Sequence, residues 1–401
     1  MHQRLDPGDA VVTSKTVLRL PSTTGSLDAY ALNQAAPFPD RQPGRMNRIA
    51  FSAAHVVADP LKECDPWLTC AVDWDRTIAF REYLWDLGLG VAEAMDTAQR
   101  GMGLDWPNSL ELIRRSVIAA KPRNGLVFSG AGTDHLPDNA SSTIDEVIAA
   151  YERQISDIEK LGGRIILMCS RALTRAAKNA DDYVKVYSRI LRQVREPVIL
   201  HWLGDMFDPA LAGYWGAKDV DAAMNTVLAI IDEHASKVDG IKISLLDKGK
   251  EVAMRRRLAK GVRMYTGDDF NYAELIAGDS EGYSHALLGI FDAIAPAAAA
   301  ALTSLADGDR KTFDEILAPT VPLSRHIFKA PTRFYKTGVV FLAYLNGHQD
   351  HFTMVGGQES ARSTLHLAEL FRLADKAGIL RDPDLAARRM KTIMAARGVE
   401  A

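Results

Sequence analysis

Residues 143–169, TIDEVIAAYERQISDIEKLGGRIILMC, contain the unit that decides the fold. The first part has a single apolar stripe at helical spacing, formed by Ile144, Val147, Ile148, Tyr151, Ile155 and Ile158. Thr143 and Glu146 form a capping-box pattern before this stripe, and Gly162-Gly163 follows as a stop signal. The apolar run Arg164–Cys169 comes next. The stretch therefore predicts a helix, a tight turn and a buried strand.

The same alternation of helix and strand extends along most of the chain. The predicted strands are Arg48–Ser52, Val91–Ala94, Leu126–Ser129, Arg164–Cys169, Val198–His201, Gly240–Ser244, Val262–Thr266 and Tyr283–Leu287. Each is short and largely apolar, as parallel strands buried on both faces are. Eight such strands separated by helices predict an α/β protein with a closed (β/α)₈ TIM barrel. An open doubly wound sheet is the alternative, but no G-x-G-x-x-G motif follows an early strand.

The chain divides into three predicted regions. Residues 1–46 form an N-terminal extension, in which Val11–Leu20 can pair as a strand and 21–45 is rich in turn formers. Residues 47–295 form the barrel, and 296–401 form helices packed on it. The helices predicted there are one that opens at Pro296, then Arg310–Ile316, Pro331–Asn346 and Ser360–Gly378.

The composition restricts the possible partners. Of 401 residues, 47% are hydrophobic and 25% are charged, with a net charge of −3, so neither a nucleic acid nor an anionic membrane is expected as a partner. Cys64, Cys70 and Cys169 fit neither a disulfide framework nor a zinc site. The apolar window Ala286–Leu302 is broken by an aspartate and a proline, and no secretory signal is visible, so we expect a cytoplasmic protein.

Polar residues gather near the predicted carboxyl ends of the strands, where TIM barrels carry their active sites. They are Ser52 and His55, Glu93 and Asp96, Ser129, Cys169 and Ser170, His201, Lys242 and Ser244, Thr266 with Asp268 and Asp269, and Ser284 with His285. These residues predict a small-molecule site, for which Trp202 can supply an aromatic wall.

Lys242 is the most informative of them, because it lies within a strand between Ile241 and Ile243. If the isoleucines face the helices, the lysine faces the barrel interior. Desolvation there lowers the pKa of the amine, and the neutral amine is a nucleophile toward a carbonyl. The alternative is a lysine paired with an interior carboxylate for structure alone.

Other candidates also have structural interpretations. His201 is either a site residue or a core histidine, and the same choice applies to His285. Asp268 and Asp269 contact substrate or cap the following helix.

Two segments carry a resemblance to a known superfamily. Asp239-Gly-Ile-Lys-Ile-Ser244 resembles the segment with the Schiff-base lysine of the dihydrodipicolinate synthase and N-acetylneuraminate lyase superfamily, and Tyr265-Thr-Gly-Asp-Asp269 resembles its turn after strand seven. Leu365–Leu380 resembles its last helix, and the order and spacing agree from about Asn47 onward. The chain is most similar to a dihydrodipicolinate-synthase-like bacterial branch. The resemblance implies a class I aldolase-type enzyme with Lys242 as its Schiff-base residue, no organic cofactor, and a homodimer or homotetramer.

The chain departs from the superfamily at two places. Where that superfamily has a Gly-Thr-Thr-Gly-Glu loop for a keto acid carboxylate, this chain has Ala94–Gln99, in which only Thr97 remains and Asp96 adds a negative charge. Where the superfamily has a proton-carrying tyrosine on strand five, this chain has His201, which can do the same work. A keto sugar therefore fits Glu93 and Asp96 better than pyruvate does, because carboxylates accept hydrogen bonds from hydroxyls.

The predicted function is a Schiff-base lyase, aldolase or dehydratase that acts on a small keto acid or keto sugar through Lys242, with His201 moving the proton. Thr97 helps to orient the substrate, and Ser244 is a further contact. One alternative is an isomerase or hydrolase with zinc or manganese held by Glu93, His201, Asp269 and His285. Another is a sugar-sensing barrel without catalysis.

Overall fold

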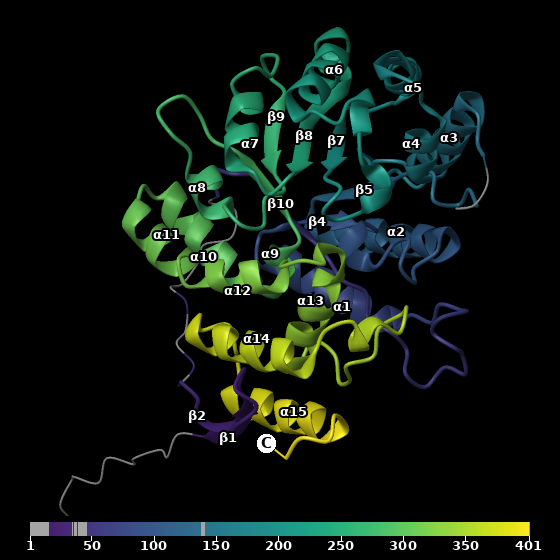
Figure 1. Cartoon of the computed structure of the whole chain (residues 1–401). Coiled ribbons are helices and arrows are strands. Elements are labelled where there is room, and N and C mark those ends of the chain that lie inside the picture. Colours follow the sequence, from purple (N-terminus) through teal and green to yellow (C-terminus); the bar gives the residue numbers. More distant parts are fainter. Residues whose placement is uncertain (1–15, 34, 36–37, 39–45, 138–140, 401) are drawn as a thin grey trace, which may run out of the picture.

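The centre of the computed structural model is a closed barrel of eight parallel strands (Figure 1). The structure describes residues 16–33, 35, 38, 46–137 and 141–400. The barrel strands are β3 (Ala50–Ala53), β4 (Gly90–Glu93), β5 (Val127–Ala131), β6 (Arg164–Leu167), β7 (Val198–Leu203), β8 (Val238–Ser244), β9 (Arg263–Thr266) and β10 (His285–Leu288). β10 pairs with β3 and closes the ring. The predicted TIM barrel is confirmed, and each predicted strand overlaps an observed one.

Helices surround the barrel. They are α1 (Trp74–Asp86), α2 (Trp106–Ala120), α3 (Ile144–Lys160), α4 (Arg171–Ala176), α5 (Ala180–Gln193), α6 (Val220–Glu233), α7 (Lys248–Arg255), α8 (Tyr272–Ala277) and α9 (Ile290–Ala293). In α3 both hydrogen bonds of the predicted capping box are present, between Thr143 and Glu146. A cap of this kind stabilises a helix by about 1 kcal/mol.

The strands separate two apolar cores. The inner core fills the lumen and is made of Phe51, Ala53, Ala92, Met95, Phe128, Ile166, Ile199, Tyr265 and Leu287. The outer core lies between strands and helices, and it includes Ile241 and Ile243 of β8. Side chains alternate between the two faces of a strand, so membership of one core fixes the direction of the neighbouring side chains.

The N-terminal region differs from its prediction. An antiparallel hairpin joins β1 (Val17–Pro21) and β2 (Leu27–Ala31). Residues 11–15 of the predicted strand lie outside the described residues, while the stretch predicted to be only turns contains β2. The hairpin binds a C-terminal helix, because the Tyr30 hydroxyl donates to Asp375 over 2.7 Å.

The C-terminal helices lie on the side toward which the strand arrows point (Figure 1). They are α10 (Ala295–Ala306), α11 (Arg310–Leu317), α12 (Thr320–Ile327), α13 (Tyr335–Leu345), α14 (Thr364–Lys376) and α15 (Pro383–Ala396). The four predicted helices are confirmed, but α12 and α15 were not predicted. α12 has Pro322 in its first turn, which resembles a helix breaker; α15 does carry a signal, with Asp382 as N-cap and Pro383 after it.

In the part of the chain that the structure describes, no helix is both long and apolar enough to cross a membrane.

Candidate functional site

Lys242 faces the lumen of the barrel. Its neighbours Ile241 and Ile243 pack outward against the helices, so the lysine between them points inward. The pairing of strands agrees with this direction, because Lys242 is opposite His201 on β7 and Tyr265 on β9, and the Tyr265 ring lies in the inner core. The lysine side chain is only 7% exposed.

A glycine makes room for this lysine. Gly267 follows β9, and a Cβ atom there would come within 2.6 Å of Lys242 Cε and also meet the Ser244 hydroxyl. Since real Cβ atoms do not approach so closely, a side chain at this position would displace the amine.

No carboxylate lies within ion-pair distance of Lys242 among the described residues, and its Nζ has no hydrogen bond there. Burial lowers the pKa of Lys242 from its ordinary value, while the more distant charges of Asp269 and Asp96 oppose that shift. The interpretation of Lys242 as half of an interior ion pair therefore does not describe the structure.

His201 and Ser244 point into the lumen beside Lys242. His201 Nε2 lies 3.5 Å from the Ser244 hydroxyl, at the limit of a hydrogen bond, and its Nδ1 is buried without a partner in the described chain. Burial, together with repulsion from Lys242, lowers the pKa of His201 well below 6.5. Burial therefore favours the neutral imidazole over the imidazolium ion.

The two aspartates after β9 have different surroundings. Asp268 accepts hydrogen bonds from the backbone N–H groups of Phe270 and Asn271, so it holds the turn before α8, but it does not cap this helix, whose N-cap is Asn271. Asp269 accepts from the N–H of Ile290 and has no such role in α8. Burial raises the pKa of Asp269 to about 7, although Lys242 opposes the shift.

Asp96 and Thr97 begin the short 3₁₀ helix η1 (Asp96–Ala98) after β4. Asp96 is half-buried, and its carboxylate has no hydrogen bond or ion pair within the described ranges. The hydroxyl of Thr97 is 2.8 Å from that of Tyr335 on α13. Because Thr97 lies directly after β4, this contact places the Tyr335 hydroxyl at the carboxyl end of the barrel.

The structure corrects the prediction for Glu93. This carboxylate faces outward from β4 and is fully buried against α1 and α2, where Arg81 binds both of its oxygens at 2.9 Å and Ser116 donates a further hydrogen bond. Val91 on the same face lies in the outer core, as alternation requires. Glu93 is therefore part of the barrel wall and not of the substrate site.

Trp202 and His285 are corrected in the same way. Trp202 alternates with the inward His201, and it packs outward at 6.3 Å from the Trp215 ring. His285 is the first residue of β10, so it lies at the amino end of the barrel, where its Nδ1 accepts from the N–H of Ile49. The predicted strand began two residues too early, which hid this difference.

These placements also correct the predicted metal site. Of its four ligands, Glu93 points out of the barrel and His285 lies at the opposite end from His201 and Asp269. Among the described residues, no group of three or more histidine, cysteine, aspartate or glutamate side chains is arranged to hold a metal ion.

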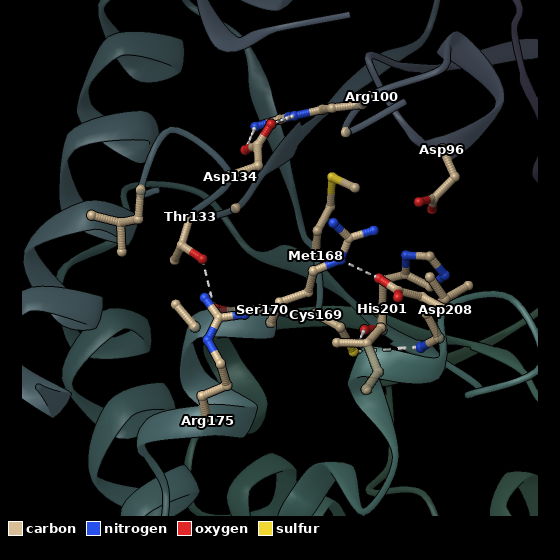
Figure 2. A pocket seen from close by; sticks show the side chains of 17 residues that line it. Asp96, Arg100, Thr133, Asp134, Met168, Cys169, Ser170, Arg175, His201 and Asp208 are labelled. Atoms are coloured by element: carbon tan, nitrogen blue, oxygen red, sulfur yellow. Dashed lines mark hydrogen bonds and ion pairs between the residues drawn. The ribbon is translucent and has the colours of Figure 1, made fainter. Parts of the chain in front are cut away.

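A cavity of about 100 Å³ opens beside these residues, at the loops after β4, β5, β6 and β7 (Figure 2). Asp96 and His201 line it, and His201 is the residue of β7 that pairs with Lys242 of β8. The far side is lined by Thr133, Ser170 and Arg175. Lys242 itself is not among the lining residues, and it is connected to the cavity through His201, its partner on the neighbouring strand.

Sequence reasoning missed Arg175, which lines this cavity, and also Tyr335 and Lys336 of α13, which do not line it. Burial lowers the pKa of Lys336 to about 8, and its Nζ contacts the Arg333 carbonyl at 3.2 Å. No sequence signal identifies Tyr335 and Lys336, because they come from a helix outside the barrel repeat. Arg175 could have been found, since it follows a predicted strand end within a few residues.

A family model described as a protein of unknown function (DUF993) matches residues 18–399. The chain belongs to this family. No curated protein matches the chain.

Solved dihydrodipicolinate synthases share the fold. The 4-hydroxy-tetrahydrodipicolinate synthase of Methylacidiphilum fumariolicum is 14% identical, with a TM-score of 0.61 over 85% of this chain and 98% of that chain. The dihydrodipicolinate synthase of Oceanobacillus iheyensis is 14% identical, with a TM-score of 0.60 over 82% and 96%. The enzyme from Aquifex aeolicus is 12% identical, with a TM-score of 0.57 over 88% and 99%. The expected likeness to this superfamily is thus present in the fold.

Proposed function

We propose that the protein is a class I aldolase-type lyase or dehydratase, in which Lys242 forms a Schiff base with a small ketone. The observation that carries the proposal is the buried Lys242 amine, which points into the lumen without an ion-pair partner in the described chain. A structural lysine in a barrel needs an adjacent carboxylate to offset its desolvation. A nucleophilic lysine needs a site without an adjacent carboxylate, because only its neutral form attacks a carbonyl.

In the proposed reaction the Lys242 nitrogen forms a bond to the carbonyl carbon, and the oxygen leaves as water. The resulting iminium accepts the electron pair when a carbon–carbon bond to a hydroxyl-bearing carbon breaks, or when an α-proton is removed before dehydration. His201 takes the proton, because its imidazole faces the lumen on the strand next to Lys242. Asp269, with a pKa of about 7, exchanges a proton with the departing water.

Borohydride trapping tests the imine. The protein is incubated with dihydroxyacetone, dihydroxyacetone phosphate, pyruvate or 4-oxopentanoate, reduced, and measured by intact-mass and peptide mass spectrometry. The expected result is a gain equal to the ketone less one oxygen atom, on the peptide with Lys242. Lys242→Ala should abolish the adduct while the circular dichroism spectrum stays unchanged.

Lys336 offers a matched control, since it is also buried, with a pKa of about 8, near the same Asp96. Lys336→Met should keep the adduct. An adduct that survives in Lys242→Ala and disappears in Lys336→Met would refute the assignment of Lys242. Stabilisation by ketones without any adduct would favour a sensing barrel.

A further inference from the structure

Most charges around the cavity are already neutralised. Arg100 binds Asp134 through both a 2.6 Å and a 2.9 Å contact, and although burial alone would raise the pKa of Asp134, Arg100 lowers it to about 2. On the other wall, Arg171 forms an ion pair with Asp208 at 2.6 Å. These four side chains therefore form two pairs that supply little net charge to a ligand.

Two charges in the lining remain, and they have opposite sign. Asp96, which is half-buried, and Arg175, which is exposed at the rim, both line the cavity, and neither side chain has an ion pair or hydrogen bond with another described residue. Asp96 begins η1 directly after β4, and it lines the same cavity as His201. Figure 2 shows Arg175 on the opposite side of the cavity from Asp96 and His201.

The surroundings of Arg175 supply hydrogen-bond donors. The hydroxyls of Thr133 and Ser170 lie 2.6 Å apart, so one of the two hydrogens lies between them. Ser170 Oγ also accepts from the Leu173 N–H as the N-cap of α4. Whichever hydroxyl donates to the other, one hydroxyl hydrogen of the pair has no acceptor and is able to donate to a ligand.

This set of donors beside Arg175 has the character of an oxyanion site. A guanidinium offers a planar fork of N–H groups that matches a carboxylate or a phosphate, and it accepts nothing. Asp96 at the other end has the opposite preference, because a carboxylate only accepts hydrogen bonds, such as those of a hydroxyl.

We propose that the substrate is a short hydroxyketone whose far end carries a carboxylate or phosphate group, bound by Arg175 with Thr133 and Ser170. Its hydroxyl lies at Asp96 and its carbonyl at Lys242, an assignment that rests on the function proposed above. The anionic group is thus separated from the carbonyl, unlike in a 2-keto acid, whose carboxylate would lie beside the negative Asp96. The small cavity, about 100 Å³, restricts the chain to a few carbons.

The test compares ketones that differ only in charge and in where it lies. 4-Oxopentanoate carries a carboxylate two methylenes from its ketone, 2-pentanone is its neutral counterpart, and pyruvate has the charge adjacent. Dihydroxyacetone phosphate and dihydroxyacetone form the phosphate arm. We expect half-maximal trapping at concentrations at least about 10-fold lower for the ketones with a remote charge than for their neutral partners.

Arg175→Gln should reduce that preference to less than about twofold, and Arg175→Lys should keep part of it. The control is Arg192→Gln, which removes an exposed arginine that pairs with Glu233 away from the cavity and should keep the full preference. The preference for the charged over the neutral ketone is compared between the carboxylate pair and the phosphate pair. The pair with the larger preference identifies the anionic group. Equal trapping of charged and neutral ketones, or a preference unchanged in Arg175→Gln, would overturn the proposal.

Calorimetry with Lys242→Ala separates this proposal from the previous one, because no imine forms in that variant. Binding of 4-oxopentanoate or dihydroxyacetone phosphate there should weaken about 10-fold when Arg175→Gln is added. If this loss occurs while no ketone is trapped in the parent protein, the anion site stands and the Schiff base fails. If trapping occurs without any dependence on Arg175, the Schiff base stands and the anion site fails.

Discussion

Glu93 is the last residue of β4 and Asp96 follows it by three residues, yet their carboxylates have opposite hydrogen-bonding environments. Glu93 receives four hydrogen bonds, two from Arg81 and one each from Ser116 and the Ala94 N–H. Asp96 receives none from the described side chains or backbone and lies against the cavity.

The presence or absence of such partners distinguishes structural from functional charges in this barrel. A buried carboxylate that serves the fold must have its partners in place, since desolvation costs several kcal/mol. A carboxylate that awaits a ligand keeps its acceptors open. Lys242 belongs with Asp96 by this criterion, whereas Arg81 belongs with Glu93.

The largest expected effect comes from breaking the satisfied pair. Glu93→Ala should lower the free energy of unfolding by about 3–5 kcal/mol, because it leaves Arg81 charged and fully buried. Denaturant unfolding measures this loss. The double variant Arg81→Leu with Glu93→Leu should recover most of it, and a single variant that loses less than about 1 kcal/mol would contradict a structural role.

Asp96→Asn should have a large effect on the trapping rate and a small effect on stability. The rate of imine trapping with dihydroxyacetone should fall about 100-fold, equivalent to about 2.7 kcal/mol, because a neutral amide oxygen accepts hydrogen bonds from the ketone's hydroxyls more weakly than a carboxylate does. The free energy of unfolding should change by no more than about 0.5 kcal/mol. A stability loss as large as that of Glu93→Ala would place Asp96 with the structural charges.

Glu251 lies between these two carboxylates in the number of hydrogen bonds that it receives. It is buried with one partner, the Ser284 hydroxyl at 2.6 Å, and burial raises its pKa to about 8. The folded state therefore holds a proton that the unfolded state releases near pH 4.5, so stability should fall as the pH rises from about 4.5 to 8. Glu251→Gln should remove that decline, which amounts to about 4 kcal/mol between pH 5 and pH 8. Unfolding titrations at pH 5 to 9 measure it, and parallel curves for both proteins would rule out this carboxyl as the source.

The smallest effect is expected at the amino end of the barrel. His285→Ala should cost about 1 kcal/mol in stability, since the Ile49 N–H loses its acceptor, and should change the trapping rate less than twofold. If the trapping rate instead dropped about 10-fold with stability preserved, His285 would have to be returned to the site.

The barrel was predictable because its signals are local. Strand and helix periods, the Thr143–Glu146 cap and the glycine stop after α3 all act within one β/α unit, and eight repeats of that unit leave few alternative folds. The hairpin of β1 and β2 was not predicted. Its turn formers outweigh its short strands in sequence, and its stability depends on contacts with α14 more than 300 residues away.

For the candidate site, sequence alone determined that Lys242 alternates with two isoleucines and that His201 and Asp96 follow strand ends. Tertiary structure decided which of those polar side chains face the lumen. A shift of one residue reverses the direction of a strand side chain, which is why Glu93 and Trp202 were assigned to the site in error. The tertiary structure also placed Tyr335 of α13 next to Thr97. The sequence did not predict this contact, because packing between a C-terminal helix and the barrel mouth does not change the local pattern of either segment.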